Sequence, residues 1–443
     1  MKRIAVPAVS VALLVAVACA GQTQPATLAP TAATAAALRP FADSLIGDRM
    51  FRSANWGALV VDPLTGDTLY SHNAGKLFMP ASNEKLLTGA TALAQLGPNF
   101  RFVTRFATNG VVHDSTLEGD LIVIGRGDPT FSDSMRTGDY RNAFRDMADS
   151  LRARGIRRIR GSLRRAGDAF PDSTYGFGWQ VDDLATPSGA VIDELFLNEG
   201  LLPANRARAS GDTAAGPIVI RDPAAAFLGA LAAALAERHI VLDGGADARI
   251  ALADSALRPL FDLHSVPLSM ILPRMLKPSQ NQIAEILFKT LALENTGVGT
   301  ADSARRVVER QLLAWGALPD GFAVRDGSGM SRHDYVTPET IVRVLDTMRT
   351  RADFQSWYDA LPVAGVDGTL ATRMNRTAAE RNVHAKTGTV DKTRSLSGYV
   401  SMADGRLLIF SFLCNNFSVP NREVDRVQEA MLVLLASSRA GTR

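Results

Sequence analysis

Cysteine is nearly absent from this chain of 443 residues, which contains only Cys19 and Cys414. Small secreted folds that cannot build a large core depend on several disulfides, so a disulfide-held fold is excluded here. A large core is possible instead, because 46% of the residues are hydrophobic. Cys414 lies in the apolar stretch "LLIFSFLCNN", which favours a buried structural thiol over a nucleophile.

Excess charge of one sign and clustered histidines are missing as well. The 48 basic and 45 acidic side chains leave a formal net charge of +3, which argues against a dedicated nucleic-acid-binding protein. The six histidines are scattered and form no His-x-x-x-His or Glu-flanked pair. We therefore expect no metal site.

Long apolar runs are lacking beyond the first twenty residues. Two basic residues precede the apolar run Ile4–Ala18, which is too short for a comfortable membrane span and suits a signal peptide. We expect residues 1–20 to be that signal peptide and 21–36 to be a disordered leader, so that the mature protein is exported to the periplasm. Cleavage after small residues is the favoured outcome, with lipidation of Cys19 as the alternative.

The order of predicted elements indicates an α+β domain that is interrupted by an insertion. Strands are predicted within 56–73 and 382–415, near both ends of the chain, and helices are predicted between them. From about residue 101 the pattern changes to short strands with two helices. We therefore expect one domain formed by 37–100 and 264–443, with an inserted mixed α/β region at 101–263.

Ser82 and Lys85 lie three residues apart where a helix is predicted to begin, in "MPASNEKLLTGATALAQLG". Residues i and i+3 share one face of a helix, and a helix start stabilises negative charge. A serine hydroxyl becomes an effective nucleophile when a base takes its proton, and a buried lysine can be that base. The pair alone is a weak signal, because an N-cap serine beside a solvated lysine has the same pattern.

A second motif, Ser279-Gln280-Asn281, follows Pro278 at a predicted break between two helical stretches. Its hydroxyl and amide could pass a proton and hold a lysine or a substrate amide. A simple helix cap is the plain alternative for this motif.

A third motif, Lys386-Thr387-Gly388-Thr389, lies in the predicted strand "VHAKTGTV". The lysine and threonines could bind a substrate carboxylate, while Gly388 would let another backbone approach closely. A solvent-facing strand is the alternative for this motif alone. The three motifs together, in the order Ser-x-x-Lys, Ser-x-Asn and Lys-Thr-Gly, match the set of penicillin-binding proteins and class A β-lactamases.

On these motifs the chain resembles the low-molecular-mass class C penicillin-binding proteins, a family of D-alanyl-D-alanine carboxypeptidases and endopeptidases. "LEGDLIVIGRGDPTF" in the inserted region and "VRDGSGMSRHDYVTP" after the second motif are similar to stretches of that family. The 194 residues that separate Lys85 from Ser279 leave room for the insertion typical of it. One departure is Gln280, where Asp is commoner, and it puts only fine positioning in doubt. The segment around "DGSGMS" could shape the rim of the active site or be a glycine-rich turn.

The resemblance implies a β-lactamase/transpeptidase-like fold and a role for each residue of the first two motifs. Ser82 would attack the carbonyl of the penultimate D-Ala and form an acyl-enzyme, and Lys85 would take its proton. Ser279 would relay a proton to the leaving amine, and Asn281 would orient Lys85 and the substrate amide. Water would then release the acyl group without a metal or an organic cofactor.

The resemblance also implies how the substrate is held. Lys386, Thr387 and Thr389 would bind the terminal carboxylate, next to Gly388 in the same strand. The backbone N–H groups of Ser82 and Thr389 would form the oxyanion hole. The expected partners are peptidoglycan stem peptides, with β-lactams as covalent inhibitors, and neither nucleic acid nor an integral membrane span is expected in the mature chain.

Three functions remain open at this point. The first is a peptidase that trims a terminal D-Ala or cuts D-Ala-linked cross-bridges, two reactions that use the same site. The second is a β-lactamase, which needs a well-placed deacylating base that the sequence does not reveal. The third is a non-hydrolytic module that binds the wall or senses β-lactams, although all the reactive residues are present.

Overall fold

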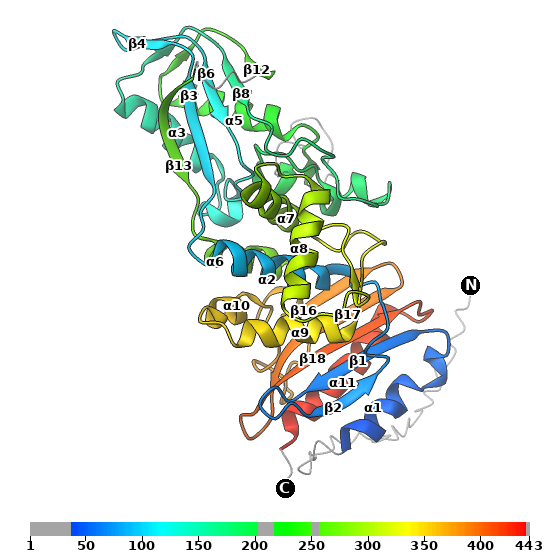
Figure 1. The fold of residues 1–443 in the computed structure, drawn as a ribbon. Coiled ribbons are helices and arrows are strands. Elements are labelled where there is room, and N and C mark those ends of the chain that lie inside the picture. The colour runs from blue at the N-terminus through cyan, green and yellow to red at the C-terminus, as the bar shows by residue number, and fades with distance from the viewer. Residues whose placement is uncertain (1–36, 203–216, 250–256, 440–443) are drawn as a thin grey trace, which may run out of the picture.

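A computed structural model describes residues 37–202, 217–249 and 257–439 of the chain (Figure 1). The predicted signal peptide and leader, including Cys19, lie outside the described residues. Within the described residues, no helix is long and apolar enough to cross a membrane.

The main sheet joins the two ends of the chain. Its strand order is β16-β17-β18-β1-β2, and every neighbouring pair is antiparallel. The strands are β1 (Asn55–Val61), β2 (Thr68–His72), β16 (His384–Val390), β17 (Thr393–Ser401) and β18 (Leu407–Asn415). Trp56 of β1 pairs with Cys414 of β18, and this cysteine is fully buried, in agreement with its predicted structural role.

Two hydrophobic clusters form on opposite faces of this sheet, because successive strand residues point to opposite sides. One cluster contains α1 (Leu38–Ile46) and α11 (Asn421–Ser437) together with sheet residues such as Phe410 and Phe412. The other contains the neighbouring strand residues Ile409 and Leu413 with a layer of helices. The main sheet is therefore the middle layer of three.

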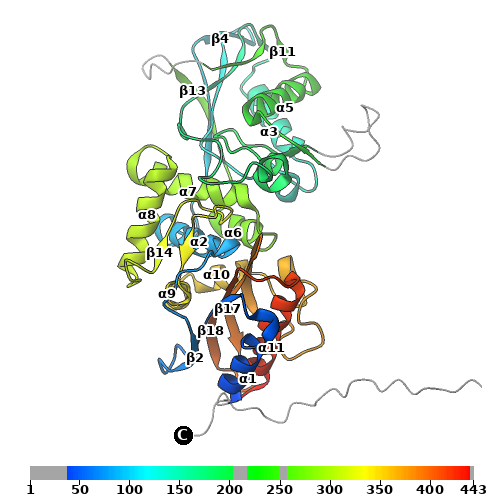
Figure 2. The ribbon, with the colours of Figure 1, turned by 90° about the vertical axis from the view of Figure 1, so that its right-hand side faces the viewer.

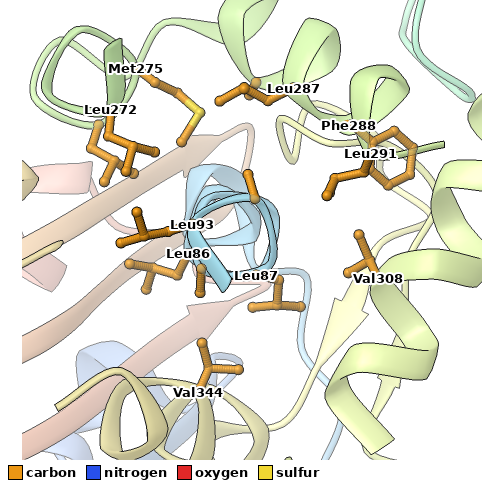
Figure 3. Close-up of a cluster of buried hydrophobic side chains, with 14 of the residues drawn as sticks. Leu86, Leu87, Leu93, Leu272, Met275, Leu287, Phe288, Leu291, Val308 and Val344 are labelled. Carbon is orange, nitrogen blue, oxygen red and sulfur yellow. The ribbon is translucent and has the colours of Figure 1, made fainter. Parts of the chain in front are cut away.

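The helical layer is built around α2 (Glu84–Leu96), whose residues from Glu84 to Leu93 are all buried. Figure 3 shows leucines of α2 pointing outward in several directions toward side chains of the surrounding helices. Small residues on α2 permit this packing: a Cβ at Gly89 would lie only 2.9 Å from Met275 Cε. The surrounding helices are α6 (Leu268–Leu276), α7 (Asn281–Thr296), α8 (Ala301–Ala314), α9 (Pro338–Arg349) and α10 (Phe354–Ala360), and the short hairpin β14 (Phe322–Ala323) and β15 (Tyr335–Val336) lies in the same half of the chain.

The inserted region lies on the far side of this helical layer from the main sheet (Figures 1 and 2). Its larger sheet has the order β12-β8-β6-β3-β13 and mixes parallel and antiparallel pairs. A smaller sheet has the order β11-β7-β5-β4. The elements are β3 (Val103–Thr108), β4 (Val111–His113), β5 (Thr116–Glu118), β6 (Leu121–Ile124), α3 (Arg141–Ala153), β7 (Arg158–Ile159), β8 (Leu163–Ala166), β9 (Leu201–Leu202), β10 (Ile218–Val219), α5 (Pro223–Glu237), β11 (Val241–Leu242), β12 (Ala246–Arg249) and β13 (Arg258–His264).

The predicted fold class is confirmed: an antiparallel sheet with helices is interrupted by a large mixed α/β region. Helix α3 and helix α5 pack together in the inserted region and share a separate hydrophobic cluster with its larger sheet. The domain limits at 37–100, 101–263 and 264–443 stay a prediction.

Candidate active site

Ser82 lies in a short 3₁₀ turn (Ala81–Asn83) directly before α2. The prediction that a helix begins near Ser82 agrees with the structure, in which the 3₁₀ turn leads directly into α2 at Glu84. Ala81, the first residue of this turn, has a positive φ of 48°. Two hydrogen bonds tie this turn to the main sheet: Asn83 Nδ2 donates to Lys386 O at 2.8 Å, and Ser395 Oγ donates to Pro80 O at 2.6 Å.

Lys85 has three hydrogen-bond partners around its amino group. Its Nζ lies 2.9 Å from Ser82 Oγ, 2.7 Å from Asn281 Oδ1 and 2.7 Å from Ser328 O. The side chain is completely buried. Burial lowers the pKa of Lys85 to about 8, although nearby carboxyl groups, led by Asp326, act in the opposite direction. A lysine whose pKa is close to neutral pH can act as a general base.

Asn281 is the first residue of α7, and its amide orientation follows from its partners. Its Nδ2 donates to Ser188 O at 3.1 Å and to Met330 Sδ at 2.7 Å. Because both partners only accept, the amide oxygen must face Lys85. Ser188 belongs to the inserted region, so this region contributes directly to the position of a predicted site residue.

Ser279 lies in the break between α6 and α7, as the sequence predicts. It adopts a positive φ of 66°, an uncommon conformation for a non-glycine residue. Its Oγ accepts a hydrogen bond of 2.8 Å from Lys386 Nζ, which also donates to Thr387 O at 2.8 Å. Burial, together with the charge of Lys85, lowers the pKa of Lys386 well below its usual range.

Gly388 provides the close approach that the third motif predicts. A Cβ at this position would lie 2.1 Å from Ser395 Oγ, 2.6 Å from Pro80 O and 2.9 Å from Ser82 N. Only glycine therefore lets β16 lie directly against the turn that holds Ser82. The backbone of the strand and the N–H of Ser82 thus lie side by side.

The two threonines of the third motif have different environments. Thr387 Oγ1 donates to Thr369 Oγ1 at 2.7 Å. Thr389 is exposed, and its Oγ1 accepts a hydrogen bond from Arg394, which is also paired with Asp425 of α11. Arg394 thereby fixes the side chain of Thr389 at the exposed edge of the site.

The structure brings together the residues of all three motifs. Ser82, Lys85 and Asn281 form one hydrogen-bonded chain, and Ser279 and Lys386 form a second. Asn83 links the two chains through Lys386 O. Sequence reasoning missed the contributions of Ser188, Ser328, Thr369 and Arg394. The glycine-rich segment is both a turn and a wall of the site, because its Ser328 carbonyl binds Lys85.

Comparison with known proteins agrees with this geometry. The sequence model of the D-Ala-D-Ala carboxypeptidase 3 (S13) family matches residues 41–218 and 209–438. The chain belongs to this family. It is therefore a peptidase, and the alternatives of a β-lactamase or a non-hydrolytic module are not favoured.

Individual relatives cover most of the chain. A D-alanyl-D-alanine carboxypeptidase from Actinomadura sp. is 32% identical over 90% of this chain and 84% of its own length. The crystal structure of penicillin binding protein 4 (dacB) from Haemophilus influenzae has a TM-score of 0.77 at 22% identity, and the match covers 88% of this chain and 98% of that one. The same protein complexed with a β-lactam has a TM-score of 0.68 at 21% identity, over 88% of this chain and 98% of that one. These structures share the fold of this family member.

Proposed function

We propose that this family member is an exported serine-type peptidase that cleaves D-Ala-D-Ala or D-Ala-linked peptides of peptidoglycan through an acyl-enzyme on Ser82. The observation that carries the proposal is the 2.9 Å contact between Ser82 Oγ and the fully buried Nζ of Lys85. The N-terminal run Ile4–Ala18 supports export.

The partners of Lys85 determine where its lone pair points in the neutral form. A neutral amine has two N–H groups, and Asn281 Oδ1 and Ser328 O can only accept hydrogen bonds. These two acceptors take the two N–H groups, so the lone pair faces the hydroxyl of Ser82. With a pKa of about 8, roughly a tenth of Lys85 is neutral at pH 7.

In the acylation step, Ser82 Oγ forms a bond to the carbonyl carbon of the penultimate D-Ala while its proton moves to Lys85 Nζ. The carbonyl oxygen becomes an oxyanion that the N–H groups of Ser82 and Thr389 would bind. The close contact at Gly388 supports this placement of β16 beside Ser82. The C–N bond then breaks, and the proton that Lys85 took from Ser82 passes through the hydroxyl of Ser279 to the amine of the leaving D-Ala.

Lys386 would bind the terminal carboxylate of the substrate with the hydroxyls of Thr387 and Thr389. Its lowered pKa reflects burial without a counter-ion, and a bound carboxylate would restore the charged form. Its hydrogen bond to Ser279 would also hold that hydroxyl beside the leaving amine. Water then attacks the acyl carbon, and Ser82 is released.

Mass spectrometry of the mature protein after incubation with benzylpenicillin tests this proposal, together with D-Ala release from a synthetic peptide that ends in D-Ala-D-Ala. We expect a stable adduct on Ser82 and release of D-Ala, and we expect Ser82→Ala to lose both. An adduct on another residue would overturn the assignment of Ser82. Rapid penicillin loss without an adduct would indicate a β-lactamase, and neither reaction would indicate a non-hydrolytic module.

The intact mass in the same experiment tests the proposals for the N-terminus. Cleavage of the signal peptide removes residues 1–20, whereas lipidation leaves a modified Cys19 at the new terminus. A mass that includes the apolar run would contradict both.

A further inference from the structure

Four carboxyl side chains are buried close to Lys85, and the proposed mechanism uses none of them. Glu84 lies on α2, Glu285 lies on α7, and Asp326 and Asp334 lie on the loop that follows β14. We call these four residues the carboxyl cluster. None of the four is more than 1% exposed.

Asp326 is the member of the carboxyl cluster with the most hydrogen-bond donors. Its carboxyl oxygens accept hydrogen bonds from the backbone N–H groups of Ser328, Gly329 and Ser331, and Trp179 Nε1 donates to Oδ2 at 2.8 Å.

Glu285 and Asp334 have fewer donors than Asp326. Glu285 Oε1 accepts the N–H groups of Gly327 at 3.0 Å and Ser328 at 2.8 Å. Asp334 Oδ1 accepts hydrogen bonds from two backbone N–H groups, whereas no described residue donates a hydrogen bond to its buried Oδ2. Burial, with the charge of Asp326 as the next cause, raises the pKa of Glu285 to about 8 and that of Asp334 well above its usual range.

Glu84 is the member of the carboxyl cluster with the fewest hydrogen-bond donors. It is completely buried, and neither of its carboxyl oxygens has a hydrogen-bond partner among the residues that the structure describes. A buried carboxylate without donors is costly, so protonation is its main route to stability. Burial, then Asp326 and Glu285, raise the pKa of Glu84 well above its usual range, whereas Lys85 opposes them.

The charged groups around the cluster do not neutralise four anions. Lys289 of α7 faces Glu285 but binds Asp172 Oδ1 at 2.5 Å, and Glu309 of α8 adds a further negative charge facing Glu84. Lys386 of β16 faces Lys85 from the other side. Among the described residues, no group of three or more His, Cys, Asp or Glu side chains is arranged to hold a metal ion. Bound protons must therefore neutralise part of the negative charge of the carboxyl cluster.

We propose that Glu84 is a positioning residue that exchanges charge with Lys85, and that acylation needs the form in which Glu84 keeps its proton and Lys85 is a neutral amine. This inference rests on the proposed function of Ser82 and Lys85. A second form holds the same number of protons but pairs a Glu84 anion with a Lys85 ammonium, and that form cannot take the proton of Ser82. An ionised Glu84 raises the pKa of Lys85, so the two groups titrate together.

The neutral, nearly isosteric variant Glu84→Gln tests the proposal in the full mature chain. Glutamine represents the protonated form of Glu84 at every pH and cannot form the ammonium–carboxylate pair. We expect the ratio of the acylation rates with benzylpenicillin, Glu84→Gln over wild type, to be close to one at pH 6, where both groups carry their protons in the wild-type protein. At higher pH the wild-type protein also populates forms with an ionised Glu84, so the ratio should rise to at least about threefold at pH 9. A ratio that is constant or that falls with rising pH would overturn the proposal.

Two further variants separate electrostatics from structure. Glu285→Gln keeps an oxygen acceptor for the N–H groups of Gly327 and Ser328, and we expect it to lower the midpoint of the acylation rate against pH, because ionised Glu285 raises the pKa of Lys85. Thr91→Val is the matched control: Thr91 is on α2 and fully buried, its hydroxyl has no hydrogen-bond partner among the described residues, and it carries no charge. It should change stability and leave the pH dependence of the acylation rate unchanged.

Infrared spectroscopy gives a readout that is independent of the reaction. We expect the wild-type protein at pH 7 to show a carboxylic acid C=O band that disappears in Glu84→Gln. Absence of that difference would contradict a protonated Glu84. If no variant or wild-type protein forms an adduct on Ser82, the proposed function fails. If the adduct forms and the ratio of the Glu84→Gln rate to the wild-type rate does not rise with pH, only the role of Glu84 fails.

Discussion

An exposed ion pair of the inserted region differs sharply from the charged residues around Ser82. Arg158 and Asp243 of the inserted region pair at 2.8 Å with side chains that are 48% and 31% exposed. Around Ser82, Lys85, Lys386 and the carboxyl cluster have almost no exposed surface. Water screens the first kind of pair, which contributes little to stability, whereas burial shifts the pKa values of the second kind. The comparison shows that environment, not residue type, makes a charged side chain chemically useful here.

Glycines show the same contrast. Gly229 lies within α5 of the inserted region, and an added Cβ would meet no atom within 4 Å. Gly388 lies where β16 meets the turn that holds Ser82, and an added Cβ would be 2.1 Å from Ser395 Oγ. Gly229 is therefore replaceable, whereas Gly388 is required by packing.

The largest expected effect comes from removing the buried cation. Lys85→Met takes away the proposed base, so we expect the rate of acylation by benzylpenicillin to fall about 10²- to 10⁴-fold. Lys76→Met, which changes an exposed lysine, is the control and should keep the wild-type rate. Acylation of Lys85→Met at near the wild-type rate would mean that another group takes the proton of Ser82.

Replacing each of the two glycines by alanine should have a smaller effect, and the two variants should change the free energy of unfolding in opposite directions. Gly388→Ala forces β16 away from Ser82, so we expect a loss of about 1–3 kcal/mol in the free energy of unfolding, with an acylation rate at least about tenfold lower. Gly229→Ala should raise the free energy of unfolding by up to about 1 kcal/mol, because alanine is the better helix former. Chemical denaturation and acylation kinetics measure both. Equal behaviour of the two variants would remove the contrast.

The smallest effect is expected from a surface ion pair. Arg158→Ala should lower the free energy of unfolding by less than about 1 kcal/mol, and added salt should shrink the difference further. The acylation rate should not change. A salt-independent loss of several kcal/mol, or a slower acylation, would show that this exposed ion pair contributes substantially to stability or to the reaction.

Local sequence signals located most of the elements that carry the site. The hairpin of β1 and β2, the break that holds Ser279, and the three C-terminal strands all lie where turn residues and apolar patterns predicted them. The helix predicted to begin near Ser82 is α2, but the positive φ of Ala81 just before it had no local sequence signal. A Cβ on Gly329 would lie 1.8 Å from Ala81 O, and this contact joins segments far apart in the chain.

Other site features had no sequence signal. Ser328 and Ser188 act through backbone carbonyls, which every residue has, so no motif distinguishes them. Glu84 follows the rule that acidic residues stabilise the first turn of a helix, a pattern that predicts a solvated side chain. Arg394 has the appearance of an ordinary strand residue, and only the fold reveals its contacts with Thr389 and Asp425.

The sequence by itself determined the reactive groups and their local settings: a serine and a lysine at a helix start, a hydroxyl and an amide at a helix break, and Lys-Thr-Gly on a strand. Short-range sterics and side-chain chemistry are enough for that, because each setting involves a few neighbouring residues. Only the tertiary structure decided that these settings meet, that the inserted region orients Asn281, and that Glu84 is buried beside Lys85. Burial and electrostatic coupling depend on what surrounds a group in space, and those surroundings come from segments of the chain that are distant in sequence.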